Sequence, residues 1–165
     1  MPALLALERY VPPFRQEQSV VTDWVRRWLE EGTETAARRL LKVYESAGVA
    51  SRASIVPIEE VFAGHDFEHQ NEVYRQAARD AATDLASRAL ASAGLRPDGV
   101  SLLVSVSCTG FMIPAVDAFV ADRLGLGPRL ARLPITEAGC AGGVVGLARA
   151  CDYLAARPEH AALLL

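Results

Sequence analysis

Short apolar runs alternate along the chain with longer stretches in which apolar residues recur every three or four positions. Runs rich in leucine, isoleucine and valine predict strands of a sheet covered on both faces, and the longer periodic stretches predict amphipathic helices. The predicted strands cover residues 3–10, 49–58, 100–106, 130–135 and 161–165. One helix is predicted to begin after Thr22, which would cap it. Further helices are predicted over residues 35–47, 68–93, 115–124 and 144–155. Strands that alternate with helices indicate an α/β layered fold with a mostly parallel sheet.

The longest predicted helix, residues 68–93, is rich in alanine, arginine and glutamate, which favour helix formation. Its expected apolar stripe consists of Val73, Ala77, Ala81, Leu85 and Ala89. Gly94 is expected to end the helix, and residues 96–99 form a turn that leads into the next strand.

Length and charge limit the classes of function. The chain has 165 residues, of which 51% are hydrophobic, and a formal net charge of −3. This length suffices for one domain with a hydrophobic core. No block of like charge indicates a nucleic acid or an anionic membrane surface as a partner. No apolar run is long enough to predict a membrane-spanning segment.

The N-terminal residues and the cysteines both favour a cytoplasmic location. Residues 1–10 have no basic region in front of their short apolar run, so we expect no secretory signal. The three cysteines are an odd number and form no Cys-x-x-Cys pair, so neither a disulfide framework nor a zinc site is expected. Free thiols fit a reducing compartment.

The strongest chemical signal is Cys140, in the segment Glu137–Gly143 between a predicted strand and a predicted helix. The flanking glycines allow a tight turn and close approach of a ligand to the backbone. The first turn of the following helix directs unpaired N–H groups and the positive end of the helix dipole at the sulfur, which favours the nucleophilic thiolate. We therefore interpret Cys140 as a catalytic nucleophile. The alternative that the local sequence leaves open is a buried structural cysteine.

Cys108 follows the predicted strand at residues 100–106. Ligands of α/β sheets bind beyond the carboxyl ends of the strands, so Cys108 and Cys140 are both candidates to face one cavity. The alternative for Cys108 is a small buried residue that only packs.

The three histidines offer no persuasive partner for Cys140, although a cysteine nucleophile normally needs a base. His65 and His69 have the i, i+4 spacing of metal ligands, but they depart from the His-Glu-x-x-His pattern and fall in a polar connection. We interpret them as residues of a solvated loop and expect no metal site. His160 is expected at the surface, in a turn between a helix and a strand.

The segment Ala138–Gly142 also differs by little from the Gly-x-Ser-x-Gly elbow of α/β-hydrolases, so a cysteine hydrolase is an alternative function. Ala138 in place of the first glycine counts against this alternative. Such an enzyme requires a histidine downstream of the nucleophile, and His160 alone is available.

Taken in order, several motifs resemble the N-terminal half of the type III polyketide synthases, the chalcone-synthase-like group of the thiolase superfamily. The motifs are Ser107-Cys108-Thr109-Gly110-Phe111-x-x-Pro114, Leu124-Gly125-Leu126, Gly139-Cys140-Ala141 and Arg149-x-x-Asp152. The spacing of Cys108 and Cys140 matches the family without a gap. Two earlier segments, Ala47-Gly48-Val49-x-x-Arg52 and Asn71-x-x-Tyr74, are also similar to the family. Ketoacyl-ACP synthase III enzymes share the layout but match less well around the nucleophile.

The resemblance implies the αβαβα thiolase-like fold, of which residues 1–165 would form the N-terminal half. The family's catalytic histidine and asparagine belong to a C-terminal half that is absent from this chain. The implied activity is that of an acyltransferase and condensing enzyme. Its cysteine takes an acyl group from an acyl-CoA starter and extends it with malonyl-CoA, by decarboxylative Claisen condensation, to a phenol, naphthol or pyrone. A ketoacyl-ACP synthase III-like enzyme and a non-catalytic truncated subunit are the alternatives.

The resemblance also assigns roles by position. Cys140 would be the nucleophile, and Cys108 and Thr109 would line the starter pocket. Ile113, before Pro114, would cross the interface of a homodimer into the partner's cavity. Arg52 would lie near the CoA phosphates, although this chain lacks the family's denser basic cluster there. The implied substrates are CoA thioesters, with no further cofactor.

Overall fold

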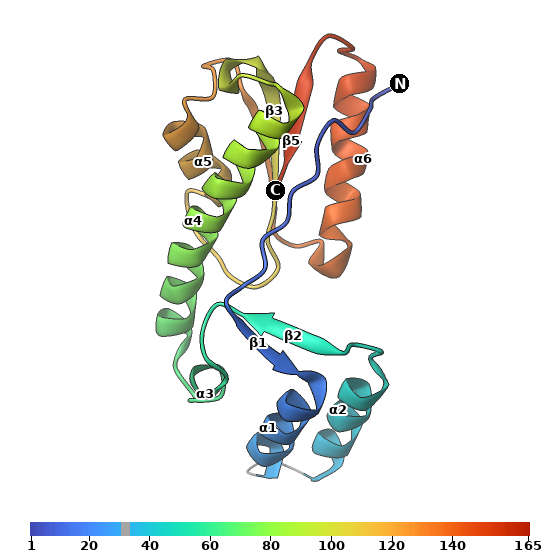
Figure 1. The fold of residues 1–165 in the computed structure, drawn as a ribbon, viewed down its shortest axis with the longest axis vertical. Coiled ribbons are helices and arrows are strands. Elements are labelled where there is room, and N and C mark those ends of the chain that lie inside the picture. The colour runs from blue at the N-terminus through green and yellow to red at the C-terminus, as the bar shows by residue number, and fades with distance from the viewer. Residues whose placement is uncertain (31–33) are drawn as a thin grey trace. The chain divides into compact units, whose positions relative to one another are not determined.

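The computed structural model describes residues 1–30 and 34–165, which divide into two compact units (Figure 1). The first, here called the sheet unit, consists of Met1–Tyr10 and Phe67–Leu165. The second, the hairpin unit, consists of Val11–Asp66. No helix among the described residues is long and apolar enough to cross a membrane.

The sheet unit contains three parallel strands in the order β4-β3-β5. The central strand β3 (Val100–Val106) pairs with β4 (Ala131–Ile135) on one side and with β5 (Ala161–Leu164) on the other. Leu103 and Val104 are fully buried, as expected for a strand covered on both faces. All three strands lie within one residue of their predicted bounds, and their parallel pairing confirms the predicted α/β class.

Helices cover both faces of this sheet (Figure 1). On one face, α4 (Phe67–Ala93) and α5 (Val116–Leu124) pack with Leu103. On the other face, α6 (Gly142–Ala155) packs over Leu102 and Val104. Successive residues of β3 thus point to opposite layers, as the twofold period of a strand requires.

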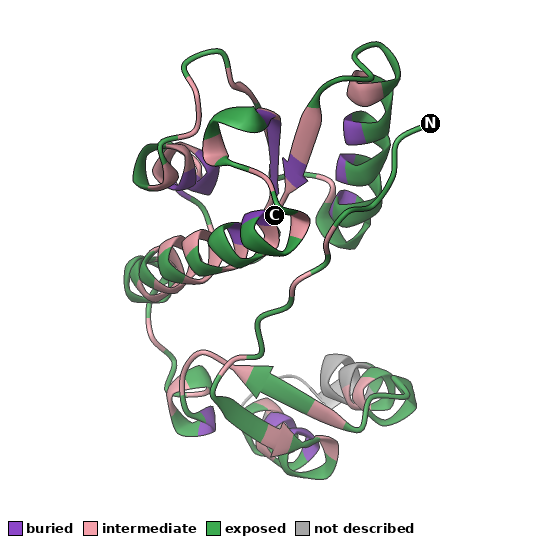
Figure 2. Ribbon diagram, turned by 45° about the horizontal axis from the view of Figure 1, so that its top comes forward, coloured by how far each residue is buried: buried purple, intermediate pink, exposed green. Residues whose placement is uncertain are grey.

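The contact between α6 and the sheet depends on small residues. The residues of α6 that are buried are Gly142, Gly146 and Ala150, each four positions after the last. A side chain at Gly146 would begin 2.8 Å from a methyl group of Leu164. The opposite side of α6 is exposed (Figure 2), although it carries Val144 and Leu147.

The hairpin unit joins two short antiparallel strands, β1 (Phe14–Glu17) and β2 (Ser51–Ser54), to the helices α1 (Gln18–Glu30), α2 (Glu34–Ser46) and α3 (Ile58–Val61). Its small core contains Val21, Val25 and Ile58. The strand predicted at residues 49–58 is shorter in the structure, where β2 covers only Ser51–Ser54. The last residue of the predicted range, Ile58, begins α3.

The prediction of a strand at residues 3–10 is wrong, because this segment pairs with no described strand. Its leucines predicted burial, yet Leu4 and Leu5 are 76% and 62% exposed. Glu8 instead accepts hydrogen bonds from the side chains of Arg88 (2.7 Å) and Ser92 (2.9 Å) on α4. An apolar run becomes a strand only where a neighbouring strand offers backbone hydrogen bonds, and the pattern of side chains does not specify that neighbour.

The predicted cap at Thr22 is also wrong, because α1 begins four residues earlier, at Gln18. The Thr22 hydroxyl donates to the Gln18 carbonyl oxygen at 2.8 Å. Threonine makes this bond inside helices and a different one at their starts, so its presence alone does not locate a helix end.

The bounds of the long helix α4 are predicted within one residue. Of its predicted apolar stripe, Ala89 packs against the core, and the other packed positions are shifted by one residue. The residues that are buried in the core or pack against it are Tyr74, Ala78, Ala82, Ala86, Ala89 and Leu90. Because alanines occur on every side of this helix, hydrophobicity alone cannot select the packed side. The larger Tyr74 and Leu90 mark it.

The turn after α4 begins at Gly94, whose φ of +64° suits glycine and confirms the predicted helix end. Arg96 and Asp98 form an exposed ion pair at 2.6 Å in the same turn. The hydrogen bond from the Arg96 guanidinium lowers the pKa of the Asp98 carboxyl from its ordinary value.

Candidate active site

The two cysteines singled out from the sequence lie in loops that leave the same edge of the sheet. Strands β3 and β4 end side by side, with Val106 opposite Ile135. Cys108 follows β3 and Cys140 follows β4, and both cysteines are exposed. This is the carboxyl edge of the parallel strands, where α/β proteins bind their ligands. Both cysteines thus follow strands at this edge, and that they face one cavity stays a prediction.

Cys140 lies in a single 3-10 turn, Gly139–Ala141, directly before α6. Gly139 has a φ of +53°, a conformation that L side chains rarely adopt. Gly142 is buried against Val106 and has no space for a side chain. These two glycines hold Cys140 at the N-terminal end of a 14-residue helix. The free N–H groups and the dipole at such an end stabilise negative charge.

The loop Ser107–Pro114 alternates between residues that face inward and residues that are exposed. Met112 is buried in the core, and Gly110 lies against the ring of Tyr74. Cys108, Thr109, Phe111 and Ile113 are exposed, Ile113 by 82%. The loop therefore presents the predicted starter-pocket residues, and the predicted interface residues Ile113 and Pro114, on its outer side.

Besides the backbone bond from the Ser107 N–H to the Ile135 carbonyl oxygen, three hydrogen bonds that involve side chains fix this loop. The Tyr74 hydroxyl lies 2.6 Å from the Ser107 hydroxyl, and the Ser107 hydroxyl donates to the Gly110 carbonyl oxygen at 3.0 Å. The Phe111 N–H donates to Asn71 Oδ1 at 2.8 Å. The loop is thus held by α4 at both sides of Cys108 and Thr109.

A buried carboxylate lies between α5 and the strands. Asp117, in the first turn of α5, is 1% exposed. Its oxygens lie 3.4 Å from the Ser105 hydroxyl of β3 and 3.5 Å from Nε of Arg132 on β4. Asp117 therefore links three elements of the sheet unit by polar contacts.

Sequence reasoning missed the roles of Asn71, Tyr74 and Asp117. The first two were noted only as a likeness to a family, and their spacing of three residues was the available signal that both share one side of a helix. Their partners lie 33 to 40 positions away, so no local pattern reveals the contacts.

Arg52 is not in the same unit as the cysteines. It lies on β2 of the hairpin unit, where its Nε donates to Gln18 Oε1 at 2.9 Å. Its guanidinium carbon lies 5.2 Å from the centre of the Tyr44 ring. These contacts orient the Arg52 side chain within the hairpin unit. The expected contact of Arg52 with the CoA phosphates stays a prediction.

Within the sheet unit, His160 is not placed to act as a base for Cys140. His160 directly precedes β5, so it lies at the amino edge of the parallel strands, opposite to the edge of Cys140. His65 belongs to the hairpin unit, where its Nε2 lies 2.9 Å from the Glu60 carboxylate. His69 lies in the first turn of α4. The position of His160 argues against a cysteine hydrolase.

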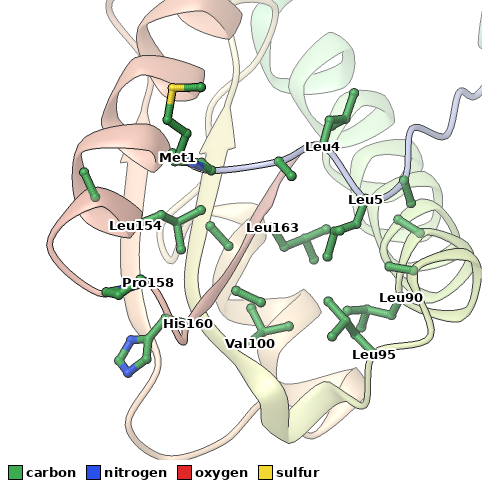
Figure 3. A pocket seen from close by; sticks show the side chains of 18 residues that line it. Met1, Leu4, Leu5, Leu90, Leu95, Val100, Leu154, Pro158, His160 and Leu163 are labelled. Atoms are coloured by element: carbon green, nitrogen blue, oxygen red, sulfur yellow. The ribbon is translucent and has the colours of Figure 1, made fainter.

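A cavity of about 610 Å³ lies at the amino edge of the sheet and not at the cysteines (Figure 3). Its walls come from residues 1–6, the C-terminal parts of α4 and α6, and the starts of β3 and β5. Figure 3 shows Leu5, Leu90 and Leu163 around it, with His160 at one side. The wall is mainly apolar and includes neither Cys108 nor Cys140. The carboxyl edge, where the loops carry both cysteines, is therefore the candidate site.

Comparisons with known proteins agree with this geometry. The family profile of the N-terminal domain of chalcone and stilbene synthases matches residues 57–165. The chain is 35% identical over 164 residues to a 1,3,6,8-tetrahydroxynaphthalene synthase of Streptomyces peucetius subsp. caesius. This match covers 99% of the chain and 43% of that relative. A phloroglucinol synthase of Pseudomonas fluorescens is 33% identical over 105 residues, which are 64% of the chain and 30% of that relative.

Among solved structures, the chain resembles 1,3,6,8-tetrahydroxynaphthalene synthase from Streptomyces coelicolor A3(2), a bacterial type III polyketide synthase. The TM-score is 0.84 at 30% identity, and the match covers 94% of the chain and 44% of that structure. The thiolase-like layered fold predicted from the sequence is thereby confirmed. The chain spans less than half the length of the curated relatives that it matches.

Proposed function

Because this chain belongs to the chalcone and stilbene synthase family, we propose that it carries the nucleophile of a type III polyketide synthase. The observation that supports this most strongly is the position of Cys140, in a glycine turn at the N-terminus of α6 and on the same edge as the Cys108 loop. The relatives include synthases of naphthol and phloroglucinol type, which favours this function over a ketoacyl-ACP synthase III or a hydrolase.

In the proposed reaction the Cys140 thiolate attacks the carbonyl carbon of an acyl-CoA starter. A new thioester forms on the cysteine and the CoA thiol leaves. Malonyl-CoA then loses carbon dioxide, and the resulting enolate attacks the carbonyl carbon of the Cys140 thioester. The bond from that carbon to sulfur breaks, the Cys140 thiolate leaves, and the acyl chain, longer by two carbons, is carried on CoA. Splitting the reaction through a covalent intermediate lowers each barrier. The enolate requires hydrogen-bond donors aimed at its oxygen.

Those donors are proposed to come from a second half of the enzyme. The chain contains one asparagine, Asn71, which is bonded to the Phe111 backbone. We propose that residues 1–165 form the N-terminal half of the thiolase-like fold, and that a C-terminal half supplies the family's histidine and asparagine. The exposure of Val144 (74%) and Leu147 (53%) on α6 supports a covering partner for this helix.

Substrate contacts are proposed for three residues. Cys108 and Thr109 would line the starter pocket, which is supported by their exposure at the edge that carries Cys140. Arg52 would lie near the CoA phosphates, which a guanidinium binds well. The substrates are CoA thioesters, and we propose no additional cofactor.

Ile113 and Pro114 are proposed to lie at a twofold dimer interface. Both are exposed at the outer side of the loop Ser107–Pro114, next to exposed Phe111. In a twofold dimer both copies of the loop would insert into the partner together.

The proposal is tested with the full-length enzyme, an acyl-CoA and carbon-13-labelled malonyl-CoA. We expect release of labelled carbon dioxide and of a polyketide, and we expect Cys140→Ala to abolish the polyketide. Cys151→Ala is the matched control, because Cys151 is an exposed cysteine within α6 rather than before it. A Cys140→Ala enzyme that still makes the product would refute the assignment.

A further inference from the structure

We infer that Asn71 and Tyr74 are positioning residues that fix the direction of Cys108 and Thr109 and so influence which starter and product the enzyme handles. This inference rests on the proposed function, since it concerns the wall of the proposed starter pocket. The contacts themselves do not depend on that function.

The first tether runs from Tyr74 through Ser107 to the backbone. The Ser107 hydroxyl donates its one proton to the Gly110 carbonyl oxygen, 3.0 Å away. It can therefore only accept from the Tyr74 hydroxyl, 2.6 Å away, so the tyrosine is the donor. The bonds form a directed chain from tyrosine to serine to carbonyl oxygen. Neither hydroxyl can be removed without leaving a half-buried partner unsatisfied.

The ring of Tyr74 adds a steric tether. It lies directly against Gly110, so that a side chain at this glycine would collide with the ring. The close approach explains why glycine occupies this position, although its backbone has no positive φ. The loop is thus pressed against α4 as well as bonded to it.

The second tether comes from Asn71, three residues earlier on the same side of α4. Its Oδ1 accepts the Phe111 N–H at 2.8 Å. This bond satisfies a backbone donor that has no strand or helix to pair with.

The two tethers bracket the proposed pocket residues. The loop is held at Ser107 on one side and at Gly110 and Phe111 on the other, with only Cys108 and Thr109 between. Because two residues have few conformations once both of their ends are fixed, the tethers determine where these side chains point. Loss of a tether should therefore alter the pocket wall without touching Cys140.

The test uses the full-length enzyme with Tyr74→Phe, which keeps the ring and removes the hydroxyl. Alkylation of each cysteine by iodoacetamide is followed by peptide mapping. We expect the rate at Cys108 to change by about threefold or more, because loss of the tether alters where the thiol points and what surrounds it. The rates at Cys140 and Cys151 should change by less than about twofold, since neither cysteine lies in the loop that Tyr74 holds. The ratio of products from two starters of different size should also shift.

Two further variants distinguish positioning from general stability. Tyr153→Phe is the matched control, because the Tyr153 hydroxyl donates to the Ser101 carbonyl oxygen (3.2 Å) on the same sheet unit, away from the loop. It should leave the Cys108 rate and the products unchanged. Asn71→Leu should behave like Tyr74→Phe, whereas Asn71→Asp keeps an acceptor oxygen and should restore wild-type behaviour.

A Tyr74→Phe enzyme whose Cys108 rate and product ratio both equal those of wild type overturns the inference. A changed rate with an unchanged product ratio overturns its claim about specificity. The alkylation measurement needs no turnover. A wild-type enzyme that makes no polyketide therefore refutes the proposed function, while the Cys108 rate still decides whether the tethers hold the loop.

Discussion

At the scale of single residues, the two glycines beside Cys140 serve different physical needs. Gly139 adopts a φ of +53°, which a side chain would strain. Gly142 has an ordinary helical φ of −54°, but it is pressed against Val106 of the central strand. The first glycine shapes the turn, and the second lets the start of α6 pack closely on the central strand.

Gly142→Ala should destabilise the protein by about 1–3 kcal/mol, because the added methyl group overpacks a close helix–strand contact. The measurement is the free energy of unfolding in denaturant. Gly143→Ala is the matched control, since a methyl group there meets no atom within 4 Å. The control should stabilise α6 by about 0.5–1 kcal/mol through helix propensity. Equal stability of the two variants would show that the contact with Val106 is unimportant.

At the scale of elements, α6 has two unlike sides. The side toward the sheet carries Gly142, Gly146 and Ala150, while the other side exposes Val144 and Leu147. A helix that is apolar on both sides is typical of one buried between two layers. This property supports the proposal that another layer covers α6 in the complete enzyme.

Val144→Asp in the full-length enzyme should therefore reduce the free energy of unfolding by about 3 kcal/mol or more, because it would bury an unpaired charge. Val43→Asp, on α2, is the control: Val43 is 61% exposed and we propose no partner that covers it. If the two variants lose the same small amount of stability, α6 has no covering layer.

Elements of the sheet unit were predictable because local signals suffice for them. The strands at residues 100–106, 131–135 and 161–164 are short apolar runs, and Gly94 and Gly125 mark helix ends with positive φ. The absence of a strand at residues 3–10 was not predictable, because a strand requires a partner strand that the segment itself does not encode.

The candidate site was predictable to a similar degree. The turn around Cys140 and the edge position of Cys108 follow from the order of strands and helices, as the sequence indicated. The hydrogen bonds of Tyr74 and Asn71 with the loop join residues more than 30 positions apart, so their recognition required the three-dimensional structure. The contact between buried Asp117 and partly exposed Arg132, on different elements, also required it.

At the scale of the whole molecule, we propose that the complete enzyme has a C-terminal half beside residues 1–165. We also propose that it forms a dimer with a second copy of itself. The second copy is proposed at Ile113, which is 82% exposed at the tip of a loop held rigidly behind it. A rigid apolar loop loses little conformational entropy when it inserts into a partner.

Ile113→Asp in the full-length enzyme should weaken the dimer by about tenfold or more, because each interface would bury two carboxylates in an apolar contact. Sedimentation velocity over a range of concentrations measures the dissociation constant, with Val43→Asp as the control for added charge. A dimer that is equally tight in both variants would place the interface elsewhere.

The central claim is that Cys140 accepts the acyl group, and acylation by an acyl-CoA without malonyl-CoA tests it most directly. The full-length enzyme is mixed with the acyl-CoA alone, digested at acidic pH and mapped by mass spectrometry. We expect one acyl group per chain, carried on the peptide with Cys140, and none after Cys140→Ala. An acyl group found on Cys108 or Cys151, or an acylated Cys140→Ala enzyme, would contradict this claim.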